Sequence, residues 1–390
     1  MRTYLDHNAT SPLRPPARAA MLRALDAGGN ASSVHAEGRK ARALIDSARE
    51  KIASALGVLP QMVVFTSGGT EANNLAVGGV LAERLIVSRT EHPSVIETAK
   101  ARGLPIDWLP VDASGRVSLA ELSTILERTA QRTLISVMLV NNETGVIQPV
   151  REIVALAGLH NTLVHTDAVQ ALGKMPVNFG VLGCDLMSIS AHKFGGPVGA
   201  GALIVRDGLS LSAQMRGGGQ ELRRRAGTEN AAVIAGFGAV VEEEILDLSP
   251  LRCRLEAELE ASSPDVVIFG RGTERIGNTS CFALPGLSAE TMLISFDLDG
   301  VAISSGSACS SGKVARSHVL EAMGAVPELA KAALRVSFGW NSTGEDIERF
   351  MGAWRRIVER SSPRRALAGL KPGVSGGAIE ITMPAAGITS

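Results

Sequence analysis

The sequence predicts an α/β protein with a large, mostly parallel sheet domain and a smaller α+β domain after it. Two observations carry this prediction. Short, continuous apolar runs alternate with helix-like stretches as far as residue 206, and such runs are typical of strands buried on both faces of a parallel sheet. After about residue 248 the alternation becomes irregular. The 42 glycines further predict many tight turns.

The elements follow from this pattern in chain order. Apolar residues three and four apart predict helices over 15–28 and 38–57, each followed or ended by glycine. We expect strands at 62–66, 84–88, 133–140, 162–166, 184–190 and 202–206. Helix-like stretches lie between them, at 70–82, 93–102, 118–130 and 150–160. For the smaller domain we expect helices at 251–260, 289–298 and 346–359 and strands at 265–269 and 278–284.

The domain boundaries follow from where the pattern changes. We expect residues 15–248 to form the large domain. Residues 1–14 and 249–370 would form the smaller one, with the segment around Cys309 in it. Residues 371–390 are rich in Gly, Ala and Pro and read as a C-terminal tail.

Composition excludes several classes of protein. With 39 basic and 39 acidic residues the net charge is zero, so we expect no direct nucleic-acid partner and no binding to an anionic membrane. The longest apolar stretch, 231–241, is far shorter than the roughly 20 residues of a membrane span. The N-terminal residues contain no apolar region of the kind found in signal peptides, so we expect none. Four cysteines in 390 residues are not a disulfide scaffold and fit a reducing, cytoplasmic compartment. Aromatic residues are only 3% of the chain, which disfavours a site built on aromatic stacking.

The four cysteines separate into two kinds. They form no CxxC pair and have no histidine at metal-ligand spacing, so we expect neither a metal site nor a disulfide framework. Cys184, Cys253 and Cys281 lie beside apolar positions and read as buried packing residues. Cys309 lies in SSGSACSSG, residues 304–312, which reads as a flexible, exposed loop. An exposed thiol in a reducing compartment suggests a reactive nucleophile.

Two motifs follow predicted strands in the first half of the chain. TSGGTEANN, at 66–74, places Gly69 and Thr70 where a helix would begin, which suits a phosphate site. An ordinary turn with a threonine cap is the alternative, and the spacing is not that of a Walker A loop. TEHPSV places His92 in a loop, before Pro93 and the start of a predicted helix. A lone histidine in a loop is usually a surface residue or one whose hydrogen bonds are satisfied. Asn141 and Asn142 could simply cap the turn NNETG.

Two more motifs suggest a pair of charged catalytic groups. Asp167, in HTDAVQ, ends an apolar strand and could bind a cation or a protonated ring, or cap the following helix. Lys193, in SISAHKFGGPVGAG, follows another strand and could be a desolvated amine nucleophile or a solvated lysine. From neighbouring strand ends, Asp167 and Lys193 could face each other across one pocket.

Lysine, aspartate and a glycine-rich phosphate turn are the minimum set for binding pyridoxal phosphate. The lysine would bind the aldehyde, and the aspartate would keep the pyridine nitrogen protonated. Because aromatic residues are scarce, His92 is the candidate for stacking on the ring. Arg335, in ALRVSFG, could hold a substrate carboxylate or form a structural salt bridge.

The motifs together resemble one known family. YLDHNAT, TSGGTEANN, TEHPSV, NNETG, HTDAVQ, SAHK, RRAGTEN and SSGSACSS occur in order over nearly the whole chain. This series resembles the cysteine desulfurases of the NifS/IscS type, which are class V, fold-type I pyridoxal phosphate enzymes. Ala191 is a departure, because relatives often have glycine there, and the 371–390 tail matches nothing in the family.

The resemblance implies a role for each motif residue. Lys193 would form the Schiff base with pyridoxal 5'-phosphate and Asp167 would pair with its ring nitrogen. His92 would stack on the ring and move protons, and Arg335 would bind the substrate carboxylate. The cofactor phosphate would be held by Gly69, Thr70, Ser190 and His192. The ring hydroxyl and the substrate region would be reached by Gln170 and Asn142. Thr228 would reach the phosphate in the other subunit of a homodimer.

The resemblance also implies an activity. The protein would be a transferase that converts L-cysteine to L-alanine and leaves the sulfur as a persulfide on Cys309. A protein acceptor, such as an iron–sulfur cluster scaffold, would then receive it. The alternatives are another class V enzyme, such as an aminotransferase or a selenocysteine lyase, and a non-catalytic paralogue that acts as a partner. The paralogue would be expected to lack Lys193, Asp167 or Cys309, and all three are present.

Overall fold

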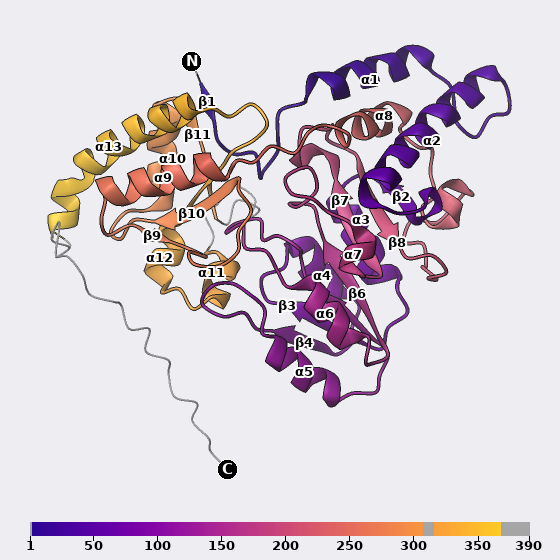
Figure 1. Ribbon diagram of the computed structural model, residues 1–390, viewed down its shortest axis with the longest axis horizontal. Helices are drawn as coiled ribbons and strands as arrows, with labels where there is room; N and C mark the ends of the chain where they lie inside the picture. Colours follow the sequence, from indigo (N-terminus) through magenta and orange to yellow (C-terminus); the bar gives the residue numbers. More distant parts are fainter. Residues whose placement is uncertain (1, 307–315, 368–390) are drawn as a thin grey trace.

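The computed structural model describes residues 2–306 and 316–367. Cys309 and the 371–390 tail therefore lie outside the described residues. Figure 1 shows a large lobe built on one twisted sheet and a smaller lobe to its left, which contains most of the chain after residue 248. Residues 3–5 return to the smaller lobe, where β1 (Thr3–Tyr4) pairs in parallel with β11 (Val301–Ala302).

The sheet of the large lobe has seven strands and is mostly parallel, as predicted. In spatial order the strands are β2 (Val63–Thr66), β8 (Gly201–Val205), β7 (Leu186–Ser190), β6 (Thr162–Asp167), β5 (Thr133–Ser136), β3 (Arg84–Ser88) and β4 (Ile106–Leu109). Only β8 runs against its neighbours, pairing antiparallel with both β2 and β7. The carboxyl ends of β6 and β7 consequently lie side by side at one edge of the sheet.

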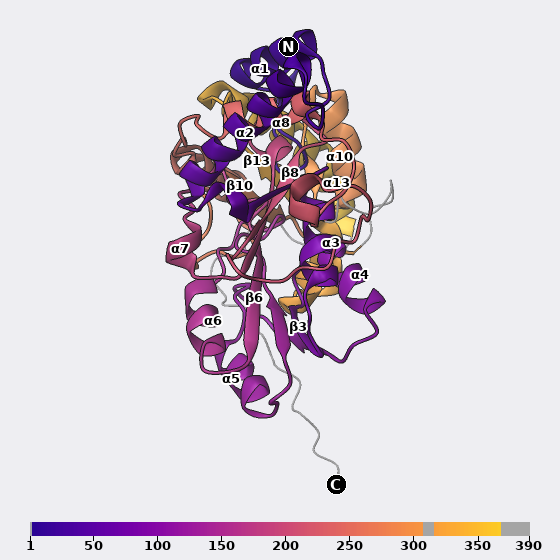
Figure 2. The same cartoon turned by 90° about the vertical axis from the view of Figure 1, so that its right-hand side faces the viewer.

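Helices cover both faces of this sheet, as Figure 2 shows. On one face, α3 (Gly69–Gly79) and α4 (Pro93–Ala101) pack on Leu85 and Val87. The intervening Ile86 belongs to the core on the other face. That face is covered by α5 (Leu119–Glu127), α6 (Val150–Ala157) and α7 (Phe179–Leu182). The continuous apolar runs of the strands are explained by this burial on both sides.

A layer of three helices closes the end of the large lobe beside β2 and β8. The helices are α1 (Pro15–Ala27), α2 (Ala36–Leu56) and α8 (Ala231–Val240). The backbones approach closely, because a methyl group on Gly238 would lie 2.6 Å from Cβ of Ala48. Leu25 of α1 is apolar and yet 63% exposed in the single chain.

The smaller lobe contains an antiparallel sheet in the order β12 (Ser304–Ser305), β13 (Leu334–Ser337), β10 (Thr279–Ala283) and β9 (Val267–Ile268). One face is covered by α9 (Ser249–Ser262), α10 (Ala289–Leu298) and α13 (Gly344–Leu367). On the other face α11 (His318–Ala322) and α12 (Pro327–Ala332) pack against Cys281 and Ala283 of β10. Phe282, Phe350 and Trp354 form an aromatic cluster in this core, with ring centroids 5.8 to 6.3 Å apart.

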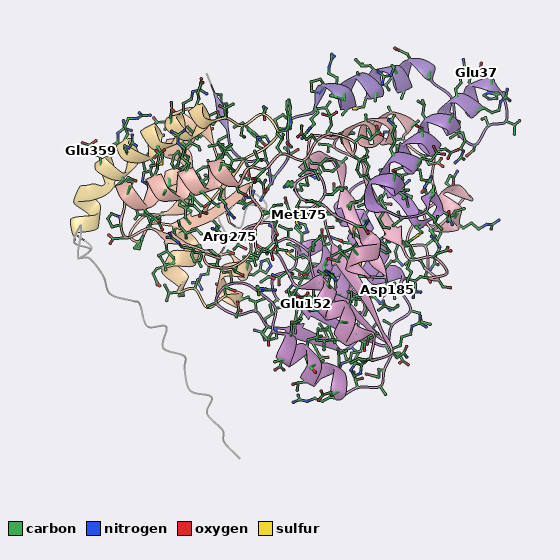
Figure 3. The ribbon with its side chains drawn as sticks, viewed as in Figure 1. Glu37, Glu152, Met175, Asp185, Arg275 and Glu359 are labelled. Carbon is green, nitrogen blue, oxygen red and sulfur yellow. The ribbon has the colours of Figure 1, made fainter. Side chains whose placement is uncertain are left out.

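The two lobes are joined by direct contacts near Arg275. Arg275 pairs with Val146 of the large lobe in an isolated bridge. Its guanidinium also forms two hydrogen bonds with Glu256, of 2.8 and 2.9 Å. Figure 3 labels Arg275 on the side of the smaller lobe that faces Met175 of the large lobe.

Several sequence predictions need correction. The strand predicted at 133–140 ends at Ser136, because Val140 pairs with Ile147 across a turn instead of extending the ladder with β3. The edge strand β4 was not predicted, since IDWL is short and only partly apolar. Ser304 and Ser305 were predicted in an exposed loop but are buried in β12.

The cysteine prediction was right for two residues. Cys184 and Cys281 are buried, whereas Cys253 is exposed on α9 because its neighbours Leu255 and Leu259 take the buried face. Over the described ranges, no helix has both the length and the apolar character needed to cross a bilayer.

Candidate active site

A cavity of about 310 Å³ opens at the carboxyl ends of the parallel strands, between the two lobes. It is lined by ten of the residues that the sequence singled out: Gly69, Thr70, His92, Asn142, Asp167, Gln170, Ser190, His192, Lys193 and Arg335. The expected convergence of Asp167 and Lys193 from neighbouring strand ends is therefore confirmed.

Lys193 ends the short helical turn Ala191–Lys193 that directly follows β7. Its Nζ donates hydrogen bonds to the carbonyl oxygens of Asn8 and Ala9, at 2.8 and 2.9 Å. The segment YLDHNAT thus passes the carboxyl end of β7, and two of its carbonyl oxygens accept hydrogen bonds from the Lys193 amine. These carbonyl oxygens, which are neutral acceptors, hold Nζ at the cavity wall.

Asp167 is the last residue of β6, and both of its carboxylate oxygens accept hydrogen bonds. Oδ1 accepts from the N–H of Val169 at 2.9 Å, and Oδ2 accepts from Nδ2 of Asn73 at 2.7 Å. The side chain therefore caps the turn that follows β6, where a helix had been expected, and it also lines the cavity. Binding of a cation or a protonated ring stays a prediction. The amide of Asn73 fixes the plane of the carboxylate.

His92 precedes α4 and caps it with its ring. Nδ1 accepts a hydrogen bond from the N–H of Ser94 at 3.1 Å and lies 2.7 Å from the Ser94 hydroxyl. Burial lowers the pKa of His92, opposed by Asp167 and assisted by Lys193 and His318. A neutral ring whose Nδ1 accepts must carry its hydrogen on Nε2. His92 therefore offers a hydrogen-bond donor at Nε2.

The turn between β2 and α3 has the features of an anion site. Gly68, the residue before the helix, has a φ of +155°, and its backbone runs against β8. A methyl group on Gly201 would lie 2.6 Å from the Gly68 carbonyl carbon. The helix begins at Gly69, so the first N–H groups and the positive end of the helix dipole face the cavity beside Thr70.

Ser190 and His192 line the same part of the cavity. The Oγ of Ser190 is buried and has no hydrogen-bond partner in the part of the chain that the structure describes. The ring of His192 contacts the Thr10 hydroxyl at 3.2 Å. Burial, together with the charges of Lys193 and Lys174, lowers the pKa of His192 to about 4. A neutral imidazole and an unpaired hydroxyl can both donate to an anion.

Gln170 is oriented by residues that the sequence analysis did not assign. Its Nε2 donates to the carbonyl oxygen of Asn8 at 3.0 Å, and its Oε1 accepts from Nζ of Lys174. Lys174 also donates to Oδ1 of Asn8 at 2.9 Å. Burial and the neighbouring charges of Lys193 and Arg335 lower the pKa of Lys174 well below its ordinary value.

Arg335 lies on β13 and is 2% exposed. Its Nη2 pairs with Asp6 at 2.8 Å, and its Nη1 donates to the carbonyl oxygen of Asn142 at 2.9 Å. Its Nε is buried without a partner among the described residues. The salt bridge considered as an alternative is therefore present, and it holds a guanidinium that still lines the cavity.

Two predicted residues are not placed in the cavity. Thr228 is exposed, in the loop before α8, and does not line it. Cys309 lies outside the described residues. Within the described ranges, no three His, Cys, Asp or Glu side chains lie close enough together to hold a metal ion.

The sequence analysis missed Asn8, Asn73, Ser94 and Lys174. The first three lie inside motifs that it quoted, YLDHNAT, TSGGTEANN and TEHPSV. The motifs gave the signal, but spacing alone does not tell which side chain points to the cavity. Lys174 lies four residues after Gln170 in a turn that is not a helix, so no pattern in the sequence indicated their contact.

Comparison with known proteins agrees with this geometry. The profile of the family described as Aminotransferase class-V matches residues 3–350. The chain belongs to this family.

Relatives within it carry a more specific name. The chain is 41% identical to "Cysteine desulfurase IscS" of Dictyoglomus turgidum, over 92% of this chain and 94% of the relative. A NifS-like protein from Rickettsia africae superposes with a TM-score of 0.85 at 34% identity, covering 92% of this chain and all of that one. A structure described as "SspA in complex with cysteine" superposes with a TM-score of 0.77 at 32% identity, covering 86% of this chain and 98% of that one.

Class V aminotransferases of this kind are pyridoxal phosphate enzymes, and the cavity fits that cofactor. The unpartnered Oγ of Ser190 and the start of α3 supply donors for a phosphate. Asp167 is an anion that could pair with a protonated ring nitrogen, and Lys193 is an amine that could bind the aldehyde. These groups are the set that this cofactor requires.

Proposed function

We propose that this protein is a pyridoxal phosphate-dependent cysteine desulfurase, a transferase that converts L-cysteine to L-alanine. The observation that carries the proposal is the convergence of Lys193, Asp167, His92 and Arg335 on one cavity. The relatives named cysteine desulfurase, at 41% identity and below, support the same activity.

When bound, pyridoxal phosphate supplies an electron sink for negative charge that develops on a substrate carbon atom. Lys193 would hold the cofactor, and its amine, once released, would take the proton from Cα of the substrate and return it as alanine forms. Asp167 would keep the ring nitrogen protonated, and Asn73 keeps the carboxylate in place. His92 would stack on the ring and move protons to and from the substrate.

The phosphate would be held by the start of α3, with Gly69 and Thr70, and by Ser190 and His192. Gln170 and Asn142 would contact the ring-hydroxyl and substrate side of the site. We propose a homodimer in which Thr228 of a second copy completes the phosphate site. The exposure of Thr228 and of the apolar Leu25 in the single chain supports this assembly.

Arg335 would bind the carboxylate of L-cysteine, using the Nε that is unpartnered among the described residues. The thiolate of Cys309 would attack the substrate sulfur. The S–S bond of a persulfide forms, the Cβ–S bond breaks, and Cβ takes up a proton to give alanine. This role of Cys309 rests on the motif SSGSACSSG.

We propose a protein acceptor for the persulfide sulfur, and an iron–sulfur scaffold is the candidate suggested by the IscS name of the relatives. A reducing, cytoplasmic setting is supported by the free thiols of Cys184, Cys253 and Cys281. We also propose that residues 15–248 form one domain and residues 1–14 with 249–370 the other. The separate core that joins Leu5 to Phe282 and Trp354 supports this division.

The activity is tested with the purified holoenzyme. L-cysteine should change the visible absorbance of the bound cofactor, and alanine should appear in an amount equal to the sulfur released. Lys193→Ala should lose alanine formation entirely. Cys309→Ala should keep the absorbance change and lose transfer of sulfur to an acceptor. Undiminished sulfur transfer by Cys309→Ala would contradict the persulfide, and no alanine from the wild type would contradict the activity.

A further inference from the structure

A buried carboxyl group lies between the two ends of the segment that carries Cys309. Glu143, in the turn NNETG, is 3% exposed. Its Oε2 accepts a hydrogen bond from the hydroxyl of Ser317 at 2.5 Å. Ser317 precedes α11 and caps it, because its Oγ also accepts from the N–H of Leu320 at 3.0 Å. The C-terminal end of the segment is thereby joined to Glu143.

Gly306, which precedes the segment on its N-terminal side, lies close to the same oxygen, Oε2 of Glu143. Gly306 directly follows β12, and a methyl group placed on it would lie 2.7 Å from Oε2 of Glu143 and 3.8 Å from Cβ of Ser317. The backbone of Gly306 does not have a positive φ. A side chain at this position would therefore require the carboxyl group of Glu143 to move.

Hydrogen bonds within the turn NNETG hold the backbone of Glu143 in place. Its N–H donates to Oδ1 of Asn141 at 3.0 Å, and the same oxygen accepts from the N–H of Thr144 at 2.9 Å. The next residue towards the N-terminus, Asn142, lines the cavity and receives Nη1 of Arg335 through its carbonyl oxygen. A single turn thus lines the substrate cavity through Asn142 and contacts Ser317 and Gly306 through Glu143.

We propose that Glu143 is a positioning residue whose carboxyl group joins Gly306 to Ser317 and so fixes where the segment carrying Cys309 leaves and re-enters the fold. The proposal rests on the proposed function, because the benefit of fixing these ends is that the thiol meets the substrate sulfur. Glu143 itself does not line the cavity. Its removal should slow sulfur transfer and leave the binding of L-cysteine in the cavity intact.

The test compares four variants of the holoenzyme: Glu143→Ala, Glu143→Gln, Ser317→Ala and Ser280→Ala. Ser280→Ala is the matched control, since Ser280 also donates from a buried hydroxyl to a buried glutamate, Glu256, at 2.8 Å. Two rates are measured, the absorbance change on adding L-cysteine and the formation of alanine. Glu143→Ala should keep the first within about twofold and lower the second about tenfold or more. Ser317→Ala should lower alanine formation about threefold or more, and Glu143→Gln, which can still accept from Ser317, should stay within about threefold of the wild type.

Limited proteolysis gives a readout that does not depend on activity. Trypsin can cut after Lys313 and Arg316, at the C-terminal end of the segment. Cleavage there should be about fivefold faster or more in Glu143→Ala and Ser317→Ala, and unchanged in Ser280→Ala. If Glu143→Ala does not fold, Ser317→Ala carries the test with both readouts.

The proposal is overturned if Glu143→Ala and Ser317→Ala are cut at the wild-type rate. It is also overturned if the absorbance change and alanine formation fall together, because Glu143 would then act on the cavity and not on the segment. If the wild type forms no alanine, the proposed function fails, while the trypsin comparison still decides whether Glu143 joins the two ends.

Discussion

The hydroxyl of Ser94 lies 2.7 Å from Nδ1 of His92, and the backbone N–H of Ser94 donates to the same nitrogen. Nδ2 of Asn73 donates to the Ser94 hydroxyl at 2.9 Å and to Asp167 at 2.7 Å. One chain of hydrogen bonds therefore connects the carboxylate at the end of β6 with the imidazole above the cavity. It fixes the orientation of both groups before any ligand arrives.

Replacing Asn73 should weaken cofactor binding. Asn73→Ala removes the donor to Asp167 Oδ2, and a hydrogen bond to a charged group is worth about 1.5–3 kcal/mol. We expect the dissociation constant for pyridoxal phosphate to rise about 10- to 100-fold, measured by absorbance titration of the apoenzyme. Asn74→Ala, on the same helix and bonded only to its own helix through Thr70 O, is the control and should bind as the wild type does. Equal affinity of the two variants would show that Asp167 needs no support.

Replacing His92 should separate stacking from proton transfer. His92→Phe keeps an aromatic ring over the cavity but has no Nε2–H. We expect cofactor affinity within about threefold of the wild type and alanine formation lowered about 100-fold or more, the range of general acid–base catalysis. Absorbance titration and a turnover assay on the same preparation check both. Turnover close to that of the wild type would exclude a proton-transfer role for His92.

Replacing Arg335 should act on the substrate. Arg335→Lys keeps a positive charge but loses the forked guanidinium that binds a carboxylate through two hydrogen bonds. We expect KM for L-cysteine to rise about tenfold or more with a smaller effect on kcat. Arg275→Lys is the matched control, because Arg275 makes an equally short forked pair with Glu256 outside the cavity. A rise in KM for both variants alike would point to a general loss of structure.

The thermal stability of Glu143→Gln should depend on pH in a defined direction. Burial raises the pKa of Glu143 from 4.5 to about 7, so the folded state binds the proton more tightly than the unfolded chain does. The bound proton stabilises the folded state fully below pH 4.5, and this stabilisation is lost as pH rises through about 7. A pKa shift of this size corresponds to on the order of 3 kcal/mol in the free energy of unfolding. Glutamine does not titrate. The Tm of Glu143→Gln relative to the wild type should therefore rise between pH 5 and pH 8.

The control for the pH experiment is Glu359→Gln, which changes an exposed glutamate on α13 (Figure 3). Its Tm relative to the wild type should be the same at both pH values. A flat Tm difference for Glu143→Gln as well would mean that Glu143 titrates in the folded protein as it does in the unfolded chain.

The parts of the site that could be predicted are those that the strand pattern fixes. Asp167 and Lys193 each follow a continuous apolar run, and neighbouring parallel strands bring such ends together. Lys174 and Glu143 could not be predicted, because nothing local in the sequence marks a charged side chain as buried. Their surroundings come from residues far along the chain, such as Asn8 and Ser317.

The errors in the fold have the same origin. Ser304 and Ser305 were assigned to a loop by their polarity, but pairing with Arg335 and Leu334 turns them into a buried strand. Cys253 was assigned to the core by its apolar neighbours, but the helix turns it outward. In each case a contact made after the chain folds back decides the environment, and local composition does not record it.

The N-terminal segment YLDHNAT, which accepts the hydrogen bonds of Lys193, also limits the order in which the protein can fold. Its start pairs Thr3 with Val301, Asn8 binds Ser337 and Thr279, and Ser11 and Arg14 bind His192 and Gly195. The wall of the cavity beside Lys193 is thus assembled from opposite ends of the described chain. Most of the chain must therefore be synthesised before that wall can close, because Asn8 has to meet Thr279 and Ser337 of the smaller lobe.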